Sequence, residues 1–373
     1  MTAQIKYKLN QFDYFVTFCK SGSIDKISKS IEKINSDKNV LLLYDKNVGK
    51  EIIEKIFTSL KISGCNVLKK DFSGSKINKN EKLLFNIIDI LLDKKFTKKS
   101  VVISCGGGVV GDVAALASSL YLRGLHYYNV PSTLTAMIDS SIGGKTAINY
   151  KGITNSVGTY YHPKNVFILE DIIKTLPQRE FIAGMAEIIK CGLIDKNKII
   201  SFLVKNKENI IKRNFKYINK LFYLTIKTKI KFFSNDVYEK NQRLLLNFGH
   251  TFAHAIEMAI ENFLKKDVIR HGEAVALGIL CEIYYSNKGR SKLYKETKKI
   301  LELFNLPVTL DNISIDISRL QNDIYKNIFL DKKRIDNFPR YISLKRKGSP
   351  KIMKIEDFDF LNDTILQLFQ SKN

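Results

Sequence analysis

The chain has 373 residues, of which 45% are hydrophobic and 11% aromatic, and it carries a formal net charge of +24 at pH 7. This length suits two domains with separate cores, and the composition excludes a disordered chain. The most apolar run, residues 101–122, is interrupted by Asp112 and a glycine cluster, so we predict no membrane-spanning segment.

The net charge and the cysteines indicate which ligands and which cellular compartment suit the protein. The lysines are spread along the chain without a basic stripe interleaved with aromatic residues, so nucleic-acid binding is not favoured, although a positive field would attract a small anionic substrate. Five scattered cysteines without CxxC spacing indicate reduced thiols. Because the N-terminus also lacks the apolar stretch of a secretory signal, we predict a cytoplasmic protein.

The first half of the chain alternates strand and helix patterns. An apolar run at 39–45 ends in Asp45, helical periodicity follows at 52–60 and 83–92, and residues 101–104 form the next strand. This alternation predicts an α/β domain with a mostly parallel sheet, whose ligands bind at the carboxyl ends of the strands. Asp45 would lie at such an end, although a helix cap is the favoured interpretation of this residue taken alone.

A glycine cluster follows the strand at 101–104. Residues 106–111 match the GxGxxG pattern and precede an alanine-rich helix, at 114–122. Glycines in this position let the backbone approach a pyrophosphate, and the helix N-terminus supplies oriented N–H groups. No carboxylate lies about 20 residues downstream, where a Rossmann fold would bind the ribose. We therefore expect a dinucleotide site of another lineage, or one in which Asp45 contacts the ribose.

A polar loop follows a third strand, at 127–130. Ser132 and Thr133 end this strand, and the stretch from Asp139 to Lys145 contains two glycines. The ending Gly-Lys-Thr resembles a P-loop, but that motif requires glycine at Asp139, so an ATPase is rejected. The acid and the lysine still suit a polar ligand.

From residue 177 onward the periodicity is almost wholly helical. We place one domain at 1–176 and an all-α domain at 177–373, because Pro177 separates the two patterns. The expected helices cover residues 178–195, 197–213, 215–233, 250–264, 272–288 and 291–304, and a short strand is expected at 340–344. Glu187 and Lys190 are neighbours on one face of the first helix. Their small and apolar flanking residues predict a semi-buried pair rather than a solvated one.

The stretch QRLLLNFGHTFAHAIE, residues 242–257, carries a polar stripe on helical spacing, if a helix runs throughout. The stripe holds Arg243, Asn247, His250, His254 and Glu257, and the opposite face is apolar. Histidines four residues apart can direct both rings at one point, as metal or catalytic sites on helices require. With His271, three of the five histidines fall in this region. A buried Glu187 beside them suggests a metal ligand.

Taken together, the motifs resemble the 3-dehydroquinate synthase family of the shikimate pathway. They occur in the family's order, from about residue 45 to about residue 344: GGGVVGD, VPSTL, DSSIGGKTAIN, TLPQRE, GMAEIIKCG, LNFGHTFAHAIE and HGEAVALG. The resemblance implies an NAD-binding α/β domain and a helical zinc-binding domain with the active site between them. It also implies a cytoplasmic homodimer and a small anionic sugar acid phosphate as substrate.

The resemblance assigns roles residue by residue. It implies Zn²⁺ or Co²⁺ bound by Glu187, His250 and His271. The implied substrate and catalytic contacts are His254, Lys190, Asn247, Arg243, Lys229, Asn155, Lys332 and Arg123, the last reaching in from a partner subunit. The implied NAD contacts are Asp45, Asn47, Lys79, Gly107, Gly108, Val109, Val110, Gly111, Asp112, Ser132, Thr133, Asp139, Lys145, Thr154, Ile172, Ile173, Lys174 and Thr175.

The reaction implied is conversion of 3-deoxy-D-arabino-heptulosonate 7-phosphate to 3-dehydroquinate and phosphate. It proceeds by transient oxidation with NAD, β-elimination, re-reduction and an internal aldol closure. This chain departs from the family at Thr154, where a lysine is common, and Lys79 is an offset counterpart of another family lysine. Another sugar phosphate cyclase and a metal-dependent polyol or alcohol dehydrogenase remain the alternatives.

Overall fold

The computed structural model of the protein describes residues 4–9, 12–32, 34–264, 268–310, 317–330, 334–335 and 337–369. The chain forms two compact units. The first comprises Met1–Pro177 and Arg213–Ile226, and the second comprises Gln178–Lys212 and Lys227–Asn373. The assignment of residues 213–226 to the first unit has no counterpart in the sequence pattern, which is helical on both sides of this segment.

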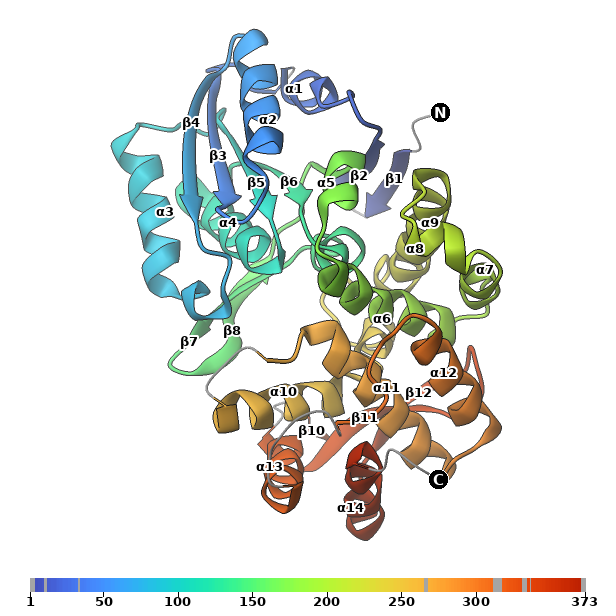
Figure 1. The fold of residues 1–373 in the computed structure, drawn as a ribbon. Coiled ribbons are helices and arrows are strands. Elements are labelled where there is room, and N and C mark those ends of the chain that lie inside the picture. The colour runs from blue at the N-terminus through green and yellow to red at the C-terminus, as the bar shows by residue number, and fades with distance from the viewer. Residues whose placement is uncertain are drawn as a thin grey trace. The chain divides into compact units, whose positions relative to one another are not determined.

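A seven-stranded sheet forms the centre of the first unit (Figure 1), in the order β1-β2-β9-β6-β5-β3-β4. Among the described strands of this sheet, β1 and β2 pair antiparallel and the other neighbours pair parallel. The mostly parallel α/β sheet expected from the sequence is thus confirmed. The strands are β1 (Gln4–Leu9), β2 (Phe12–Cys19), β3 (Asn39–Asp45), β4 (Asn66–Phe72), β5 (Val101–Gly106), β6 (His126–Pro131) and β9 (Asn165–Leu169).

The central strands are apolar because both faces of the sheet are covered. Val40–Leu43 of β3 and Val101–Ile103 of β5 are fully buried, as expected for parallel strands with helices on either side. The helix α3 begins after Asn80, whose side chain accepts a hydrogen bond of 3.1 Å from the Leu83 N–H. The helices of this unit are α1 (Asp25–Glu32), α2 (Lys50–Ile62), α3 (Glu81–Asp93), α4 (Gly108–Leu120) and α5 (Glu170–Thr175).

A two-stranded antiparallel ribbon stands apart from the main sheet. It consists of β7 (Lys145–Tyr150) and β8 (Ile153–Tyr160). Three short helical turns complete the first unit: η1 (Lys76–Asn78), η2 (Tyr121–Arg123) and the π-helical turn η3 (Ala136–Ser140). The side chains of β8 are exposed along almost the whole strand.

The second unit is mainly helical and also contains a small antiparallel sheet. The strands β10 (Arg334–Ile335), β11 (Phe338–Leu344) and β12 (Pro350–Lys354) pair in that order. The unit is therefore not the all-α domain that the sequence predicted. The helix α9 (Phe215–Phe233) begins in the first unit and ends in the second. The other described helical elements of the second unit are α6 (Gln178–Ile194), α7 (Ile199–Lys205), α8 (Lys207–Ile211), η4 (Gln242–Asn247), α10 (His250–Leu264), α11 (His271–Asn287), α12 (Lys292–Leu303), α13 (Ile317–Leu330), α14 (Phe358–Leu366) and η5 (Gln367–Phe369).

The structure interrupts one expected helix and the polar stripe at 242–257. The pattern at 197–213 forms α7 and α8, which meet at Asn206 with non-helical backbone angles. The helix expected at 250–264 is confirmed as α10, but the polar stripe at 242–257 assumed a helix that runs throughout, and this condition is not met. The stretch forms the 3-10 helix η4, a turn at Phe248 and Gly249, the latter with φ at 84°, and then α10. Arg243 and Asn247 therefore lie on a different element from His250.

Among the described residues, no helix is long and apolar enough to cross a membrane.

Candidate functional site

The side chains of Glu187, His250 and His271 meet within the second unit. Glu187 Oε1 lies 3.5 Å from His250 Nε2 and 3.6 Å from His271 Nε2. The Glu187 side chain is 1% exposed, and its Oε1 has no hydrogen-bond partner among the described residues. A buried carboxylate oxygen without a partner is costly unless a cation or donor occupies the space before it. The three side chains therefore fit a divalent cation bound by one carboxylate and two imidazoles.

The second oxygen of Glu187 contacts Lys190, one turn further along α6. The Lys190 Nζ pairs with Glu187 Oε2, and both side chains are buried. The pair is more deeply buried than the semi-buried one expected from the sequence. A buried ammonium beside the carboxylate lowers the cost of burying its charge. It also leaves the other oxygen, Oε1, directed at the two histidines.

The two imidazoles of the cluster differ in exposure. The His250 side chain is 12% exposed and the His271 side chain 33% exposed, and their ring centroids lie 5.3 Å apart. Burial, together with the nearby positive charge of Lys190, holds the pKa of His250 well below its usual value. A neutral imidazole is the form that binds a metal ion.

Close backbone contacts bring the three helices of the cluster together. A Cβ on Gly272, at the start of α11, would lie 1.8 Å from the Ala183 carbonyl oxygen of α6. A Cβ on Gly278 would lie 2.0 Å from the carbonyl oxygen of Gly249, which precedes α10. Only glycine fits at these two positions of α11. Since His250 follows Gly249 and His271 precedes Gly272, the contacts set the distances between the ligands.

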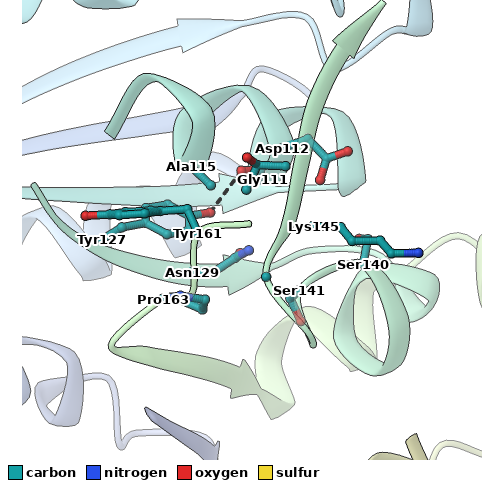
Figure 2. A pocket seen from close by; sticks show the side chains of 12 residues that line it. Gly111, Asp112, Ala115, Tyr127, Asn129, Ser140, Ser141, Lys145, Tyr161 and Pro163 are labelled. Carbon is teal, nitrogen blue, oxygen red and sulfur yellow. Dashed lines mark hydrogen bonds between the residues drawn. The ribbon is translucent and has the colours of Figure 1, made fainter. Parts of the chain in front are cut away.

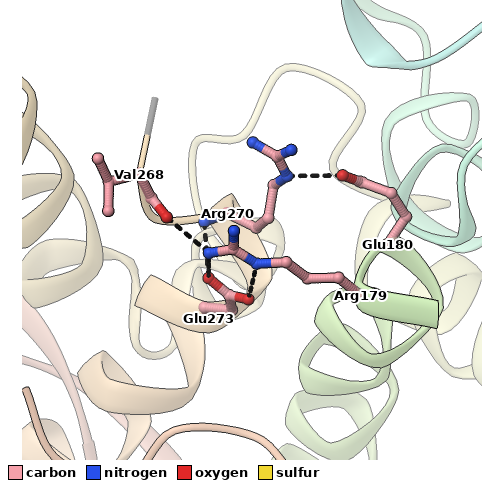
Figure 3. Close-up of polar contacts among 5 residues, drawn as sticks. All are labelled: Arg179, Glu180, Val268, Arg270 and Glu273. Carbon is pink, nitrogen blue, oxygen red and sulfur yellow. Dashed lines mark hydrogen bonds and ion pairs between the residues drawn. The ribbon is translucent and has the colours of Figure 1, made fainter. Parts of the chain in front are cut away.

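Ion pairs join the first turns of α6 and α11 (Figure 3). Arg179 forms two hydrogen bonds of 2.7 Å with the Glu273 carboxylate, which also accepts a bond from the Arg270 N–H. The Arg270 side chain donates to Glu180 at 2.6 Å. Glu273 lies two residues after His271. The network therefore holds the helix turn that carries this histidine.

His254 lies one turn after His250 on α10 and is exposed. Its ring centroid is 5.5 Å from that of His250, its i, i+4 neighbour, and 6.1 Å from that of His271 on α11. A second possible ligand set consists of His254, Glu257 and His271. In this set, however, Glu257 Oε2 already accepts a hydrogen bond from His271 Nδ1, at 3.0 Å.

Arg243 and Asn247 are held by their own loop. The Arg243 guanidinium donates to the Val237 carbonyl at 2.6 Å, and the Asp236 carboxylate accepts from the Arg243 N–H at 2.9 Å. Asn247 Nδ2 donates to Glu239 Oε1 at 2.8 Å. The Lys229 side chain is buried in the same unit. Sequence reasoning missed the roles of Asp236 and Glu239, because both lie outside any helical stripe.

In the first unit, the glycine cluster follows β5 and opens α4, as the GxGxxG pattern predicted. Asp45 ends the neighbouring strand β3, and its Oδ1 accepts a 3.0 Å hydrogen bond from the Asn47 N–H. A Cβ on Gly74 would lie 2.2 Å from Asp45 Oδ2. Asp45 and the glycine-rich turn therefore lie at the same edge of the sheet, where ligands of parallel sheets bind.

Lys79, Asp112 and Asn155 meet at the N-terminal end of α4. The Lys79 Nζ donates to Asp112 Oδ2 and to Asn155 Oδ1, both at 2.5 Å. Lys79 is 9% exposed, whereas Asn155 is exposed on the β7–β8 ribbon and has φ at 50°. These residues are far apart in the sequence. The contact joins Lys79 and Asp112, which are expected to contact NAD, with Asn155, which is expected to contact the substrate.

A small pocket lies beside this region (Figure 2). Its lining includes Gly111, Asp112, Ser140 and Lys145, and the Tyr127 hydroxyl donates to the Gly111 carbonyl at 3.1 Å. Asp112 and Lys145 direct their charged ends toward the same side in this view. The pocket is lined both by the N-terminal part of α4 and by the loop from Asp139 to Lys145, whose residue types suit a polar ligand.

The remaining expected site residues fall into three groups. Ser132, Thr133 and Asp139 lie on or beside η3, after β6. Ile172–Thr175 belong to α5, with Ile172 and Ile173 buried and Lys174 and Thr175 exposed. The exposed residues Arg123 and Thr154 lie on η2 and β8, the former with φ at 63°. Lys332 lies outside the described residues.

Comparison with solved structures defines the class of the fold. A 2-epi-5-epi-valiolone synthase from Streptomyces hygroscopicus, with NAD⁺ and Zn²⁺ bound, has a TM-score of 0.82 at 20% identity, covering 97% of this chain and 98% of that one. A 2-deoxy-scyllo-inosose synthase complexed with carbaglucose-6-phosphate, NAD⁺ and Co²⁺ has a TM-score of 0.81 at 24% identity, covering 98% and 99%. A Schizosaccharomyces pombe glycerol dehydrogenase has a TM-score of 0.65 at 17% identity, covering 94% and 88%. The chain therefore has the two-domain fold of these two synthases and, at a lower TM-score, of the glycerol dehydrogenase.

The sequence comparisons identify the family within this class. The family models for the 3-dehydroquinate synthase N-terminal and C-terminal domains match residues 71–183 and 184–334. The 3-dehydroquinate synthase of Ruminiclostridium cellulolyticum is 33% identical over 98% of this chain and 99% of its own length, and that of Clostridium beijerinckii is 37% identical over 90% and 93%. The chain belongs to the 3-dehydroquinate synthase family.

Proposed function

We propose that this protein is a 3-dehydroquinate synthase, which converts 3-deoxy-D-arabino-heptulosonate 7-phosphate into 3-dehydroquinate and phosphate. The observation that carries the proposal is the buried Glu187 carboxylate, whose Oε1 lies 3.5 Å and 3.6 Å from two imidazole nitrogens. This three-residue set occurs in a chain of the 3-dehydroquinate synthase family. The solved sugar phosphate cyclases compared above carry NAD⁺ with Zn²⁺ or Co²⁺.

The proposed metal site uses Glu187, His250 and His271. Three protein ligands leave coordination positions open, as catalytic zinc sites require. A bound Zn²⁺ or Co²⁺ supplies a Lewis acid that polarises hydroxyl and carbonyl oxygens of the substrate. The chain's own contribution is geometric: α6, α10 and α11 direct one carboxylate oxygen and two Nε2 atoms at a common point.

The proposed NAD site uses the glycine-rich turn at the start of α4. The oriented N–H groups of the first helical turn suit a pyrophosphate, and Asp45 at the end of β3 suits a ribose hydroxyl. Bound NAD supplies a reversible hydride acceptor. Lys79 holds the Asp112 carboxylate and the Asn155 amide in fixed positions, so this edge of the site is pre-organised.

The remaining polar residues have binding and proton-transfer roles in the proposal. The substrate carries a carboxylate and a phosphate, and Arg243, Lys190 and Lys229 supply cations in the metal-binding unit. His254 lies beside the proposed metal ligands and is exposed, so its ring can hold or release a proton at a substrate oxygen. The Glu239 carboxylate accepts a hydrogen bond from the Asn247 amide and orients it. Arg123, Asn155 and Lys332 complete the proposed substrate contacts.

The test is a phosphate-release assay on 3-deoxy-D-arabino-heptulosonate 7-phosphate with added NAD and Zn²⁺. We expect stoichiometric phosphate and 3-dehydroquinate without net accumulation of NADH, because the cofactor is oxidised again in each cycle. Stoichiometric NADH without phosphate would instead identify a polyol or alcohol dehydrogenase. Phosphate release from a different sugar phosphate would identify another cyclase.

We further propose that the protein works as a homodimer in the cytoplasm. All five cysteines are free and buried, which suits a reducing compartment. The family resemblance supports the dimer, in which Arg123 would contribute to the partner's site. Sedimentation equilibrium of the full chain at micromolar concentration tests this state, and a monomer with full activity would contradict it.

A further inference from the structure

Glu257 contacts one of the proposed metal ligands without belonging to the ligand set. It lies on α10, two turns after His250, and its side chain is 10% exposed. Glu257 Oε2 is 3.0 Å from His271 Nδ1. The opposite ring nitrogen, His271 Nε2, is the one that faces Glu187 Oε1. The carboxylate therefore lies on the far side of the imidazole from the proposed metal position.

This arrangement selects one form of the His271 ring. A carboxylate only accepts hydrogen bonds, so Nδ1 must carry the proton when the two groups bond. In a neutral imidazole Nε2 is then unprotonated, and its lone pair points toward Glu187. His250 shows the same pattern, because its Nδ1 lies 3.2 Å from the Phe248 carbonyl oxygen while its Nε2 faces Glu187. Both rings thus present Nε2 to one point.

The two rings have acceptors of different strength. His250 is held by a backbone carbonyl in a largely buried position, whereas His271 is more exposed and starts a helix. A hydrogen bond to a charged acceptor is stronger than one to a neutral acceptor. The more exposed ligand therefore has the stronger restraint on its orientation.

We propose that Glu257 is a positioning residue that fixes the tautomer and orientation of His271 for metal binding. This inference rests on the proposed function, since it assigns a role at the same metal site. It differs from the second possible ligand set, in which Glu257 itself would bind the ion together with His254 and His271. Partners of this kind behind a metal-bound histidine raise metal affinity about 10-fold to 100-fold.

The first test measures Zn²⁺ affinity of the metal-free full-length protein by competition with a chromophoric chelator. We expect Glu257→Ala to raise the Kd about 10-fold to 100-fold. Glu257→Gln keeps an oxygen that can accept the Nδ1 hydrogen bond but loses the charge, so its Kd should lie between those of wild type and Glu257→Ala. The matched control is Glu261→Gln, which removes the same charge one turn further along α10 and should leave the Kd unchanged.

The second test measures by NMR which nitrogen of the His271 ring carries the proton. In the metal-free protein, the ¹⁵N shifts of the His271 ring should report a protonated Nδ1 in wild type. In Glu257→Ala they should shift toward the Nε2-protonated form. If Glu257→Ala fails to fold, the Kd of Glu257→Gln decides, because this variant retains the acceptor and loses only the charge.

The outcomes separate this inference from the proposed function. If the wild-type protein binds neither Zn²⁺ nor Co²⁺, both the proposed function and this inference are wrong. Wild-type binding with an unchanged Kd and an unchanged His271 ring in both Glu257 variants overturns the positioning role alone. If Glu257→Gln loses Zn²⁺ as completely as His271→Ala, Glu257 is a ligand, and the positioning role is overturned as well.

Discussion

Lys190 contacts Glu187 one turn earlier in α6, and the two side chains are 2% and 1% exposed. Removing one member of a buried ion pair leaves the other charge unpaired and costs about 3–5 kcal/mol. We therefore expect Lys190→Met to lower the melting temperature of the metal-free protein markedly. The unpaired carboxylate should then gain more from a cation, so the rise in melting temperature on adding Zn²⁺ should exceed that of wild type. Equal rises in both proteins would show that Glu187 does not face the ion.

Metal removal should abolish turnover without unfolding the NAD-binding unit. Because His250 Nε2 lies 3.5 Å from Glu187 Oε1, we expect His250→Ala to reduce Zn²⁺ affinity by more than about 100-fold, beyond the usual effect of a supporting residue. Phosphate release should fall to background and NAD binding should persist. Atomic absorption and NAD titration measure these results. Wild-type rates after exhaustive chelation would falsify the metal assignment.

The contacts of Lys79 lead to a prediction about NAD affinity. Its Nζ bonds both Asp112 and Asn155 at 2.5 Å, and a charged hydrogen bond contributes about 1.5–3 kcal/mol. We expect Lys79→Met to weaken NAD binding at least about tenfold, as measured by calorimetry. The control is Lys76→Met, three residues earlier on η1. Similar NAD affinities for the two variants would argue against a role for the Lys79 contacts.

The environment of Asp236 predicts how the stability of the folded protein depends on pH. Burial raises the pKa of its carboxyl, but hydrogen bonds from the backbone N–H groups of Arg243, Lys240 and Asn241 outweigh this and lower it. The stabilising contribution is thus complete above the unfolded pKa of about 3.9 and is lost as the pH falls through the lower folded pKa.

We expect Asp236→Asn to lower the urea midpoint at pH 7 and to raise the KM, since this loop holds Arg243. The difference in midpoint from wild type should shrink below about pH 4, where the Asp236 carboxyl of the unfolded chain begins to bind a proton, and disappear below the lower folded pKa. A constant difference from pH 7 to pH 3.5 would show that the lost stability does not come from the charge of Asp236.

The cysteines should react slowly in the native protein. Burial raises the pKa of Cys19 to about 11 and that of Cys105 to about 12. At pH 8 the thiolate, which is the reactive form, is therefore only about one part in a thousand or less. We expect a thiol reagent to label native protein far more slowly than guanidinium-denatured protein, in which all five cysteines react. Fast labelling of several native thiols would contradict this burial.

Periodicity by itself determined most of the secondary structure. The strands at 39–45 and 101–106 and the helices at 215–233 and 250–264 agree with the patterns in their residues, because a buried strand or an amphipathic helix needs that spacing wherever it packs. Residue types along the chain also indicated a carboxylate and two or three histidines as the chemical centre. These features depend on local sequence alone.

Only the tertiary structure decided which of these groups meet. The break before α10 depends on Gly249 packing against α11, a contact between residues far apart in the chain, so helical spacing alone could not show whether residues 242–257 form one helix. The pairing of Lys79 with Asp112 and Asn155, and of Glu257 with His271, likewise joins separate elements. Local patterns describe one element at a time, whereas distances between side chains arise when whole helices pack.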